Sequence, residues 1–151
     1  MQDNTSVGKV DVNGLGAGAF DYARRQWTDK KWRTLDNRCP VIPINVSNAT
    51  KIRDKTGELT FNRLRDYIWW SLREKLEAGY KGEGDIALPP DDDLAKDLVA
   101  YKWTTTHTGK VLIESKEEVK KTLGRSTDTG DAVVLAFAPD APPYKPMIGF
   151  V

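Results

Sequence analysis

The stretch VGKVDVNGLGAGAFDYARR, residues 7–25, constrains the fold of this chain more than any other. It opens with a short apolar run that carries Asp11 near its end. Three glycines follow at alternate positions: Gly14, Gly16 and Gly18. Glycine permits a tight turn with positive φ and a close approach of two backbones. Apolar residues then recur at spacings of three and four, which predicts a helix over residues 18–28. The stretch therefore predicts a strand that presents a carboxylate to a turn before a helix.

This turn leaves two kinds of site open, a phosphate cradle at the glycines or a metal at Asp11. Gly14, Gly16 and Ala19 satisfy the dinucleotide pattern G-x-G-x-x-G/A after a strand and before a helix. However, the next predicted strand, Val41–Val46, does not end in the acid that would hold a ribose, and no series of βαβ units follows. The charge of Asp11 would also repel a phosphate. A Rossmann-like nucleotide-binding unit is therefore the weaker alternative.

Composition bounds the class of protein. A length of 151 residues suits one domain with a sizeable core. No apolar run approaches the roughly 20 residues that span a bilayer, so we expect no membrane partner. The polar N-terminus and the single cysteine, Cys39, favour a reducing cytoplasm. Because the net charge is +1, DNA binding would depend on a local basic patch.

The middle of the chain predicts a strand and two helices. Pro43 places the strand Val41–Val46 at a sheet edge or at a bulge. The longest apolar stripe predicts a helix over Phe61–Ala78, with Thr60 as N-cap and Gly79 as its end. Trp70 points away from this stripe and is either covered by a second layer or exposed. A short helix with acids in its first turn is predicted over Asp91–Val99.

The C-terminal third predicts a hairpin and two helices. The β-prone runs 101–106 and 110–114 flank a Thr108-Gly109 turn, which is a hairpin signal. Ser115 and Glu118 form a capping box for a helix that ends at Gly124. A mostly buried helix follows over residues 127–138, and the prolines beyond it predict an extended tail.

Three carboxylates form the strongest candidate site. Asp11 lies near the end of a strand, and Asp128 and Asp131 share one face at the start of the last helix. Carboxylates brought together repel one another unless a cation lies between them, and hard oxygen ligands suit Mg²⁺ or Mn²⁺. The competing interpretation is an ordinary helix start, with Asp128 as N-cap and Asp131 in the first turn. Composition and spacing alone favour the helix start.

Other chemistry has weaker support. One cysteine and one histidine cannot form a structural zinc site, and no spacing supports a Cys39/His107 catalytic pair. Four basic residues surround the penultimate helix and the loop after it: Lys116, Lys120, Lys121 and Arg125. They are interpreted equally well as a solvated helix face or as a patch that contacts DNA phosphates.

Four segments in order resemble the nuclease domain of large terminase subunits, the DNA-packaging motors of tailed bacteriophages. These segments are VDVNGLGAGAFDYAR, FNRLRDYIWWSLREKLE, GDIALPPDDDLAKDLV and KVLIESKEEVKKTLGRSTDTGDAVVLAF. The resemblance implies an α/β fold like that of ribonuclease H, with a mixed sheet flanked by helices. It also implies divalent-metal-dependent cutting of concatemeric double-stranded DNA during genome packaging. On this basis residues 1–138 would form the nuclease-like domain and residues 139–151 a proline-rich tail.

The resemblance assigns roles residue by residue. Asp11 matches the family's acid on a strand that leads into a glycine turn, and Asp131 matches the acid of the final helix, so both are the expected Mg²⁺ or Mn²⁺ ligands. Asp128 matches a frequent accompanying acid and is the third catalytic candidate. The basic run that includes Lys121 and Arg125 matches a segment beside the site, where contact with the DNA backbone is expected.

Two departures shape the expectation of activity. The family's first catalytic aspartate lies upstream of the segment that begins at Val7, and no G-x-x-x-x-G-K-[ST] phosphate loop of an ATPase domain occurs here. We therefore expect an N-terminally truncated version of the fold, weak or no cleavage, and a strand edge available for self-association. The alternative is a non-catalytic prophage remnant that binds DNA or protein, including other terminase or portal components, in the bacterial host cytoplasm.

Overall fold

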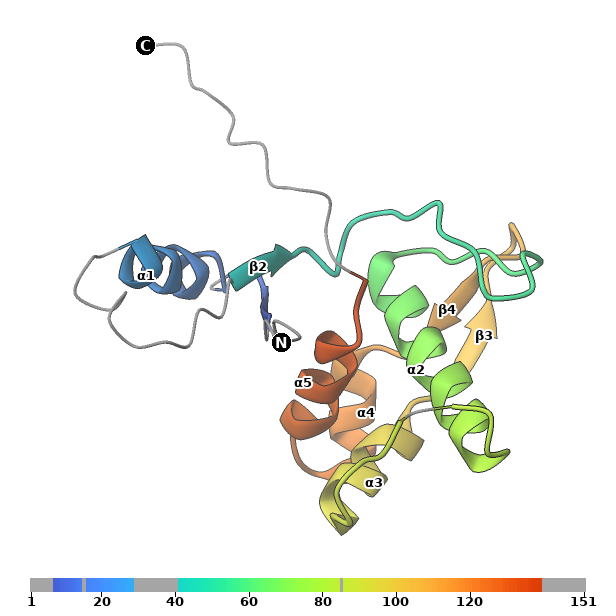
Figure 1. Cartoon of the computed structure of the whole chain (residues 1–151). Helices are drawn as coiled ribbons and strands as arrows, with labels where there is room; N and C mark the ends of the chain where they lie inside the picture. The colour runs from blue at the N-terminus through green and yellow to red at the C-terminus, as the bar shows by residue number, and fades with distance from the viewer. Residues whose placement is uncertain (1–6, 15, 29–40, 85, 140–151) are drawn as a thin grey trace. The chain divides into compact units, whose positions relative to one another are not determined.

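The computed structural model describes residues 7–14, 16–28, 41–84 and 86–139 (Figure 1). Helices and strands follow one another in the order βαβααββαα. The chain divides into two compact units, the first containing β1, α1 and β2 and the second running from Val46 to Ala138. The elements are β1 (Gly8–Asp11), α1 (Gly16–Thr28), β2 (Val41–Ile44), α2 (Leu64–Tyr80), α3 (Asp92–Ala100), β3 (Trp103–Thr105), β4 (Val111–Ile113), α4 (Lys116–Leu123) and α5 (Asp128–Ala136).

The first unit is a βαβ arrangement. β1 and β2 pair in parallel, with Gly8 opposite Val41 and Asp11 opposite Ile44. Parallel strands need a crossover connection, and α1 lies between these two in the sequence. Ile44 and Phe20 are the buried side chains of this unit among the residues described. The predicted strand–turn–helix of residues 7–28 is confirmed, with the helix beginning two residues earlier than its periodicity indicates.

The core of the second unit forms around α2. Its buried side chains come from α2, β4, α5, the segment before α2 and the residues after α5: Phe61, Ile68, Trp69, Trp70, Leu72, Val111, Ile113, Val134 and Ala138. Trp70 is covered, because Trp103 of β3 packs edge-on against its ring at 5.3 Å between centroids. The Arg73 guanidinium lies 4.7 Å from the centre of the same ring. Trp70 is therefore covered by a second layer of side chains and is not an exposed contact surface.

The predicted start and end of α2 were both wrong. Phe61 is not helical, because the segment at residue 61 forms a bridge to Val111, with Val111 N–H donating to the Thr60 carbonyl at 2.8 Å. The N-cap is Arg63, whose N–H donates to the Asp66 carboxylate at 2.8 Å. The other oxygen of Asp66 accepts from Ile113 N–H at 2.9 Å, so this buried acid joins α2 to β4. At the far end the helix continues through Gly79 to Tyr80.

Local signals at the other elements are confirmed. β3 and β4 form an antiparallel hairpin in which Trp103 lies opposite Ile113. The Asp91 carboxylate accepts from the N–H groups of Asp93 and Leu94, which caps α3. Strands of both directions are thus present, as a parallel pair in the first unit and an antiparallel pair in the second.

The predicted capping box at α4 is present. The Ser115 hydroxyl accepts from Glu118 N–H, the Glu118 carboxylate accepts from Ser115 N–H, and the helix ends at Gly124. Hydrogen bonds from the Ser115 hydroxyl and then from its N–H lower the pKa of Glu118 below its ordinary 4.5. Because Lys116 is the first residue of this helix, the capping box also places Lys116.

Substituting Ser115 with alanine should destabilise the chain by about 1 kcal/mol, the usual cost of losing an N-cap hydroxyl. It should also reduce the pH dependence of unfolding. The pKa of Glu118 is lower in the folded chain than its ordinary 4.5. Its contribution to the free energy of unfolding is therefore fully present above about pH 4.5 and is lost as the pH falls through the folded-state pKa. Urea unfolding at pH 7 and pH 3 measures both effects. An equal loss at the two pH values would contradict this account.

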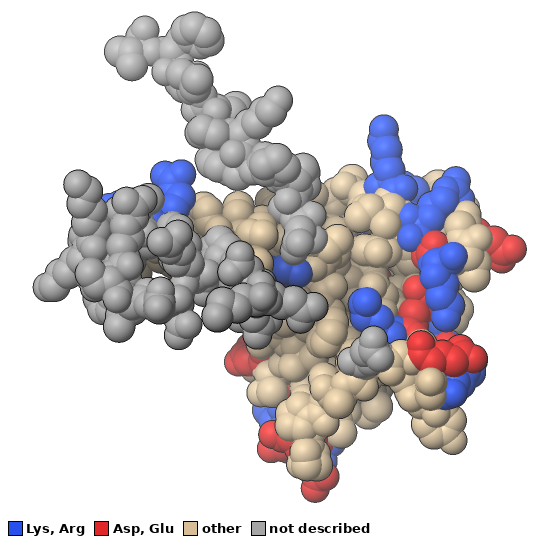
Figure 2. Space-filling model, in the orientation of Figure 1, with Lys and Arg blue, Asp and Glu red and all other residues tan. Residues whose placement is uncertain are grey.

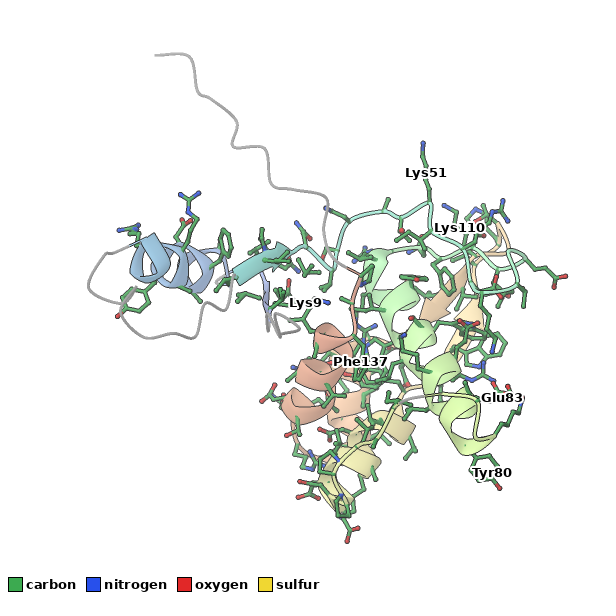
Figure 3. The ribbon with its side chains drawn as sticks, in the orientation of Figure 1. Lys9, Lys51, Tyr80, Glu83, Lys110 and Phe137 are labelled. Atoms are coloured by element: carbon green, nitrogen blue, oxygen red, sulfur yellow. The ribbon has the colours of Figure 1, made fainter. Side chains whose placement is uncertain are left out.

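The surface of the second unit carries charges of both signs. Lys and Arg side chains lie among Asp and Glu side chains in the view of Figure 2. Tyr80, 92% exposed, extends from the end of α2 (Figure 3). Among the described residues no helix is both long and apolar enough to cross a bilayer.

Candidate metal-binding site

Asp11 lies at the carboxyl end of β1, as predicted. It is half-buried, and its Oδ1 accepts from Asn13 N–H at 2.9 Å, which begins the turn. The hydrogen bond of Val12 N–H to the Ile44 carbonyl, at 3.0 Å, continues the strand pairing up to this point. The carboxylate is thus presented where the paired backbone ends.

Gly16 explains why the turn is rich in glycine. A Cβ at this position would overlap the carbonyl oxygen of Asp11 and lie 2.9 Å from its carbonyl carbon. At Gly18, in contrast, a Cβ would meet nothing within 4 Å. The glycine at position 16 lets α1 begin directly against the end of β1, which accounts for the turn without a bound phosphate.

The structure brings Asp128 and Asp131 together on one cation. Lys116 Nζ, at the start of α4, lies 2.8 Å from Asp128 Oδ1 and 2.7 Å from Asp131 Oδ2 at the start of α5. The Asp128 side chain is 78% exposed, whereas that of Asp131 is 29% exposed. Two carboxylates therefore converge on one positively charged atom at the protein surface.

The charges of this cluster shift two pKa values. Burial by itself lowers the pKa of Lys116, but hydrogen bonds and attraction from Asp128 and Asp131 outweigh burial and raise it well above its usual range. The hydrogen bond from Lys116, followed by that from Ser126, lowers the pKa of Asp128. Lys116 and Asp128 are consequently charged at neutral pH and attract one another.

The helix-start interpretation of Asp128 was wrong in its detail. The N-cap of α5 is Thr127, and Asp128 is the first helical residue. The Asp128 carboxylate bonds Lys116 and Ser126 instead of capping. Asp131 is held by two hydroxyls as well as by Lys116, at 3.3 Å from Thr127 Oγ1 and 3.4 Å from Tyr101 Oη.

The four basic residues proposed for DNA contact fall into two pairs. Lys116 is held by the two acids, and Arg125 lies 2.6 Å from the buried Asp97 and 3.6 Å from Asp93. Lys120 and Lys121 are exposed on α4. The sequence indicates the four basic residues but not that acids pair with Lys116 and Arg125. These ion pairs join residues at least twelve positions apart, so no local pattern reports them.

The other residues that the sequence singled out for chemistry are His107, Cys39 and Asp11. His107 is exposed beside the hairpin turn, and Cys39 lies outside the described residues. Within the ranges that the structure describes, no group of three or more His, Cys, Asp or Glu side chains is arranged to hold a metal. Asp128 and Asp131 belong to the second unit and Asp11 to the first.

Comparisons with known proteins give one consistent result. No protein-family model matches, and no curated protein matches the sequence. The chain is similar to the solved nuclease domain of the large terminase subunit gp2 of bacterial virus Sf6, at 19% identity and a TM-score of 0.67. The match covers 90% of this chain and 66% of that domain.

Two further structures of the Sf6 domain, both lysine-to-alanine variants, match in the same way. One contains manganese and the other calcium, each at 18% identity and a TM-score of 0.66, covering 91% of this chain and 66% of the domain. The described elements and these matches agree in architecture. The chain has the mixed α/β, ribonuclease H-like fold of the nuclease domain of a phage terminase large subunit.

Proposed function

We propose that this chain is a terminase-type, metal-dependent endodeoxyribonuclease domain that cuts concatemeric double-stranded DNA during genome packaging. The observation that carries the proposal is the convergence of Asp128 and Asp131 on one cation at the surface. Its fold is also that of a nuclease domain whose solved structures include manganese and calcium forms. The family resemblance of the sequence supplies DNA as the substrate.

The residues present fit a divalent cation in part. The ammonium of Lys116 already has carboxylate oxygens at 2.8 and 2.7 Å, so the pair offers hard oxygen ligands to a positive centre. We assign Asp131 as a ligand of Mg²⁺ or Mn²⁺, with Asp128 as the acid beside it. Asp11, in the first unit, keeps the ligand role that the family resemblance implies. A bound ion of this kind activates water and stabilises the leaving oxygen of a phosphodiester.

Other side chains have distinct roles in this proposal. A metal held by Asp128 and Asp131 would replace the Lys116 ammonium between them, and Lys116 would then be free to pair with phosphate. Lys120 and Lys121, exposed on α4, are the best placed of the proposed basic residues to contact the DNA backbone. No covalent protein intermediate is required.

We expect cleavage by this chain to be weak or absent. Asp128 and Asp131 already share the Lys116 ammonium, so a divalent cation would have to displace it. The chain spans 66% of the Sf6 domain. Robust Mn²⁺-dependent nicking of plasmid by the purified protein would overturn this expectation.

A second function is favoured by a specific observation. Lys116 lies between Asp128 and Asp131, so the two acids already share a cation without metal. A non-catalytic module that keeps the fold and its contacts to DNA, to other terminase or portal components, or to a second copy would have such a cluster.

Calorimetric titration with Mn²⁺ separates these two functions. The enzyme proposal expects binding by the wild type, loss of binding in Asp131→Asn, and tighter binding in Lys116→Ala, because Asp128 and Asp131 are then free of their internal cation. Asp21→Asn, at an exposed position of α1, is the matched control and should bind as the wild type does. Absence of binding at millimolar metal in every variant would favour the non-catalytic module.

A further inference from the structure

The first turn of α5 is capped by another helix. A threonine at the N-cap usually accepts a hydrogen bond from an N–H of the first turn. Thr127 makes no such bond. Instead Gly130 N–H, three residues into the helix, donates to Oδ2 of Asp97 in α3 at 3.0 Å. Asp97 is fully buried, and Arg125 Nη1 lies 2.6 Å from its other oxygen.

The Thr127 hydroxyl is therefore available for a different partner. It is fully buried and donates to Asp131 Oδ2 at 3.3 Å. Tyr101 Oη lies 2.7 Å from Thr127 Oγ1 and 3.4 Å from Asp131 Oδ1. Each hydroxyl has one proton to donate, so Thr127 can donate to the acid while Tyr101 donates to Thr127 or to Asp131.

Asp97 and Tyr101 lie one helical turn apart, at the end of α3. Asp97 bonds the backbone of the first turn of α5, and Tyr101 bonds the side chains of Thr127 and Asp131. The Tyr101 ring packs on Trp69 at 4.1 Å between centroids and carries the Arg65 guanidinium at 5.1 Å, which holds its hydroxyl in place. The Asp131 carboxylate is thus held by hydroxyls on its interior side and by Lys116 on its outer side.

We propose that Asp97 and Thr127 are positioning residues of the metal site. Asp97 takes over the capping of α5, and the hydroxyl of Thr127, released from that task, orients Asp131 toward the position that Lys116 Nζ occupies. The part of this inference that concerns metal rests on the function proposed above. The orientation of Asp131 does not depend on it.

Substitution of Thr127 with valine tests the inference, because valine keeps the volume and the branching and removes the hydroxyl. The urea midpoint should fall modestly, because the hydrogen bonds of the buried hydroxyl to Tyr101 and Asp131 are lost. The Mn²⁺ affinity should fall by roughly tenfold or more, as it does when supporting partners of metal ligands are removed. Thr127→Ser should restore the affinity. Thr129→Val, at the exposed position two residues along, is the matched control.

A readout without metal keeps the inference separate from the proposed function. NMR couplings that report χ1 of Asp131 should show one rotamer in the wild type and in Thr127→Ser, and averaging in Thr127→Val. If the wild type binds no Mn²⁺, the proposed function fails and these couplings alone decide the inference. An unchanged Asp131 rotamer in Thr127→Val would show that Thr127 does not orient Asp131, and would overturn the inference.

A double-mutant cycle tests the part played by Asp97. Without its carboxylate, the Thr127 hydroxyl should turn back to Gly130 N–H and leave Asp131, so Asp97→Ala should average the Asp131 rotamer as Thr127→Val does. The combined variant should then add little to either one. Additive effects would separate the two residues and overturn their proposed coupling. If Asp97→Ala does not fold, the Thr127 variants still decide the inference.

Discussion

Replacing Gly16 with alanine is expected to destabilise the first unit by about 3 kcal/mol, the upper part of the range for adding atoms where no space exists. The added methyl would overlap the carbonyl oxygen of Asp11. Both sides of this contact are attached to backbone, so no side-chain rotation can relieve it. Either α1 must begin later or the end of β1 must move, and Asp11 would move with it.

Hydrogen exchange of the amides in β1 and α1 measures this effect directly. Gly18→Ala is the matched control, because its Cβ would meet nothing within 4 Å and alanine favours the helix. We expect faster exchange of these amides in Gly16→Ala and equal or slower exchange in Gly18→Ala. Equal protection in both variants would mean that helix and strand do not depend on this close approach.

Replacing Gly130 with alanine should destabilise the second unit by about 2–3 kcal/mol. The new Cβ would lie 2.7 Å from the Cβ of Asp97. Asp97 cannot withdraw easily, because it is fully buried and paired with Arg125. The first turn of α5 must therefore shift, and Asp131, the next residue, shifts with it. The Mn²⁺ affinity should fall together with the stability.

Urea unfolding measures the loss of stability, and Thr129→Ala supplies the control on the same turn. Thr129 is exposed, and alanine favours a helix, so this variant should be as stable as the wild type or slightly more stable. A Gly130→Ala protein with wild-type stability would show that α3 and α5 can separate without cost, and it would weaken the case for capping by Asp97.

The elements predicted best from the sequence are those whose contacts are local. The capping box of Ser115 and Glu118 spans four residues, and the Thr108-Gly109 turn closes a hairpin between neighbouring strands. Such hydrogen bonds are encoded by adjacent residue types. The start of α2 was missed for the opposite reason. Phe61 fits the apolar stripe of the helix, but its backbone pairs with Val111, fifty residues further along.

The sequence by itself determined that a strand presents Asp11 to a glycine turn, that Asp128 and Asp131 share a helix face, and that the chain resembles a phage terminase nuclease domain. Only the tertiary structure decided what surrounds those acids. It placed Lys116 between Asp128 and Asp131, and it made Asp97 the cap of α5 from 33 residues away. An ion pair or a helix cap needs only a few ångströms of approach in space and leaves no periodic pattern in the sequence. The residues that surround a carboxylate are therefore determined by packing.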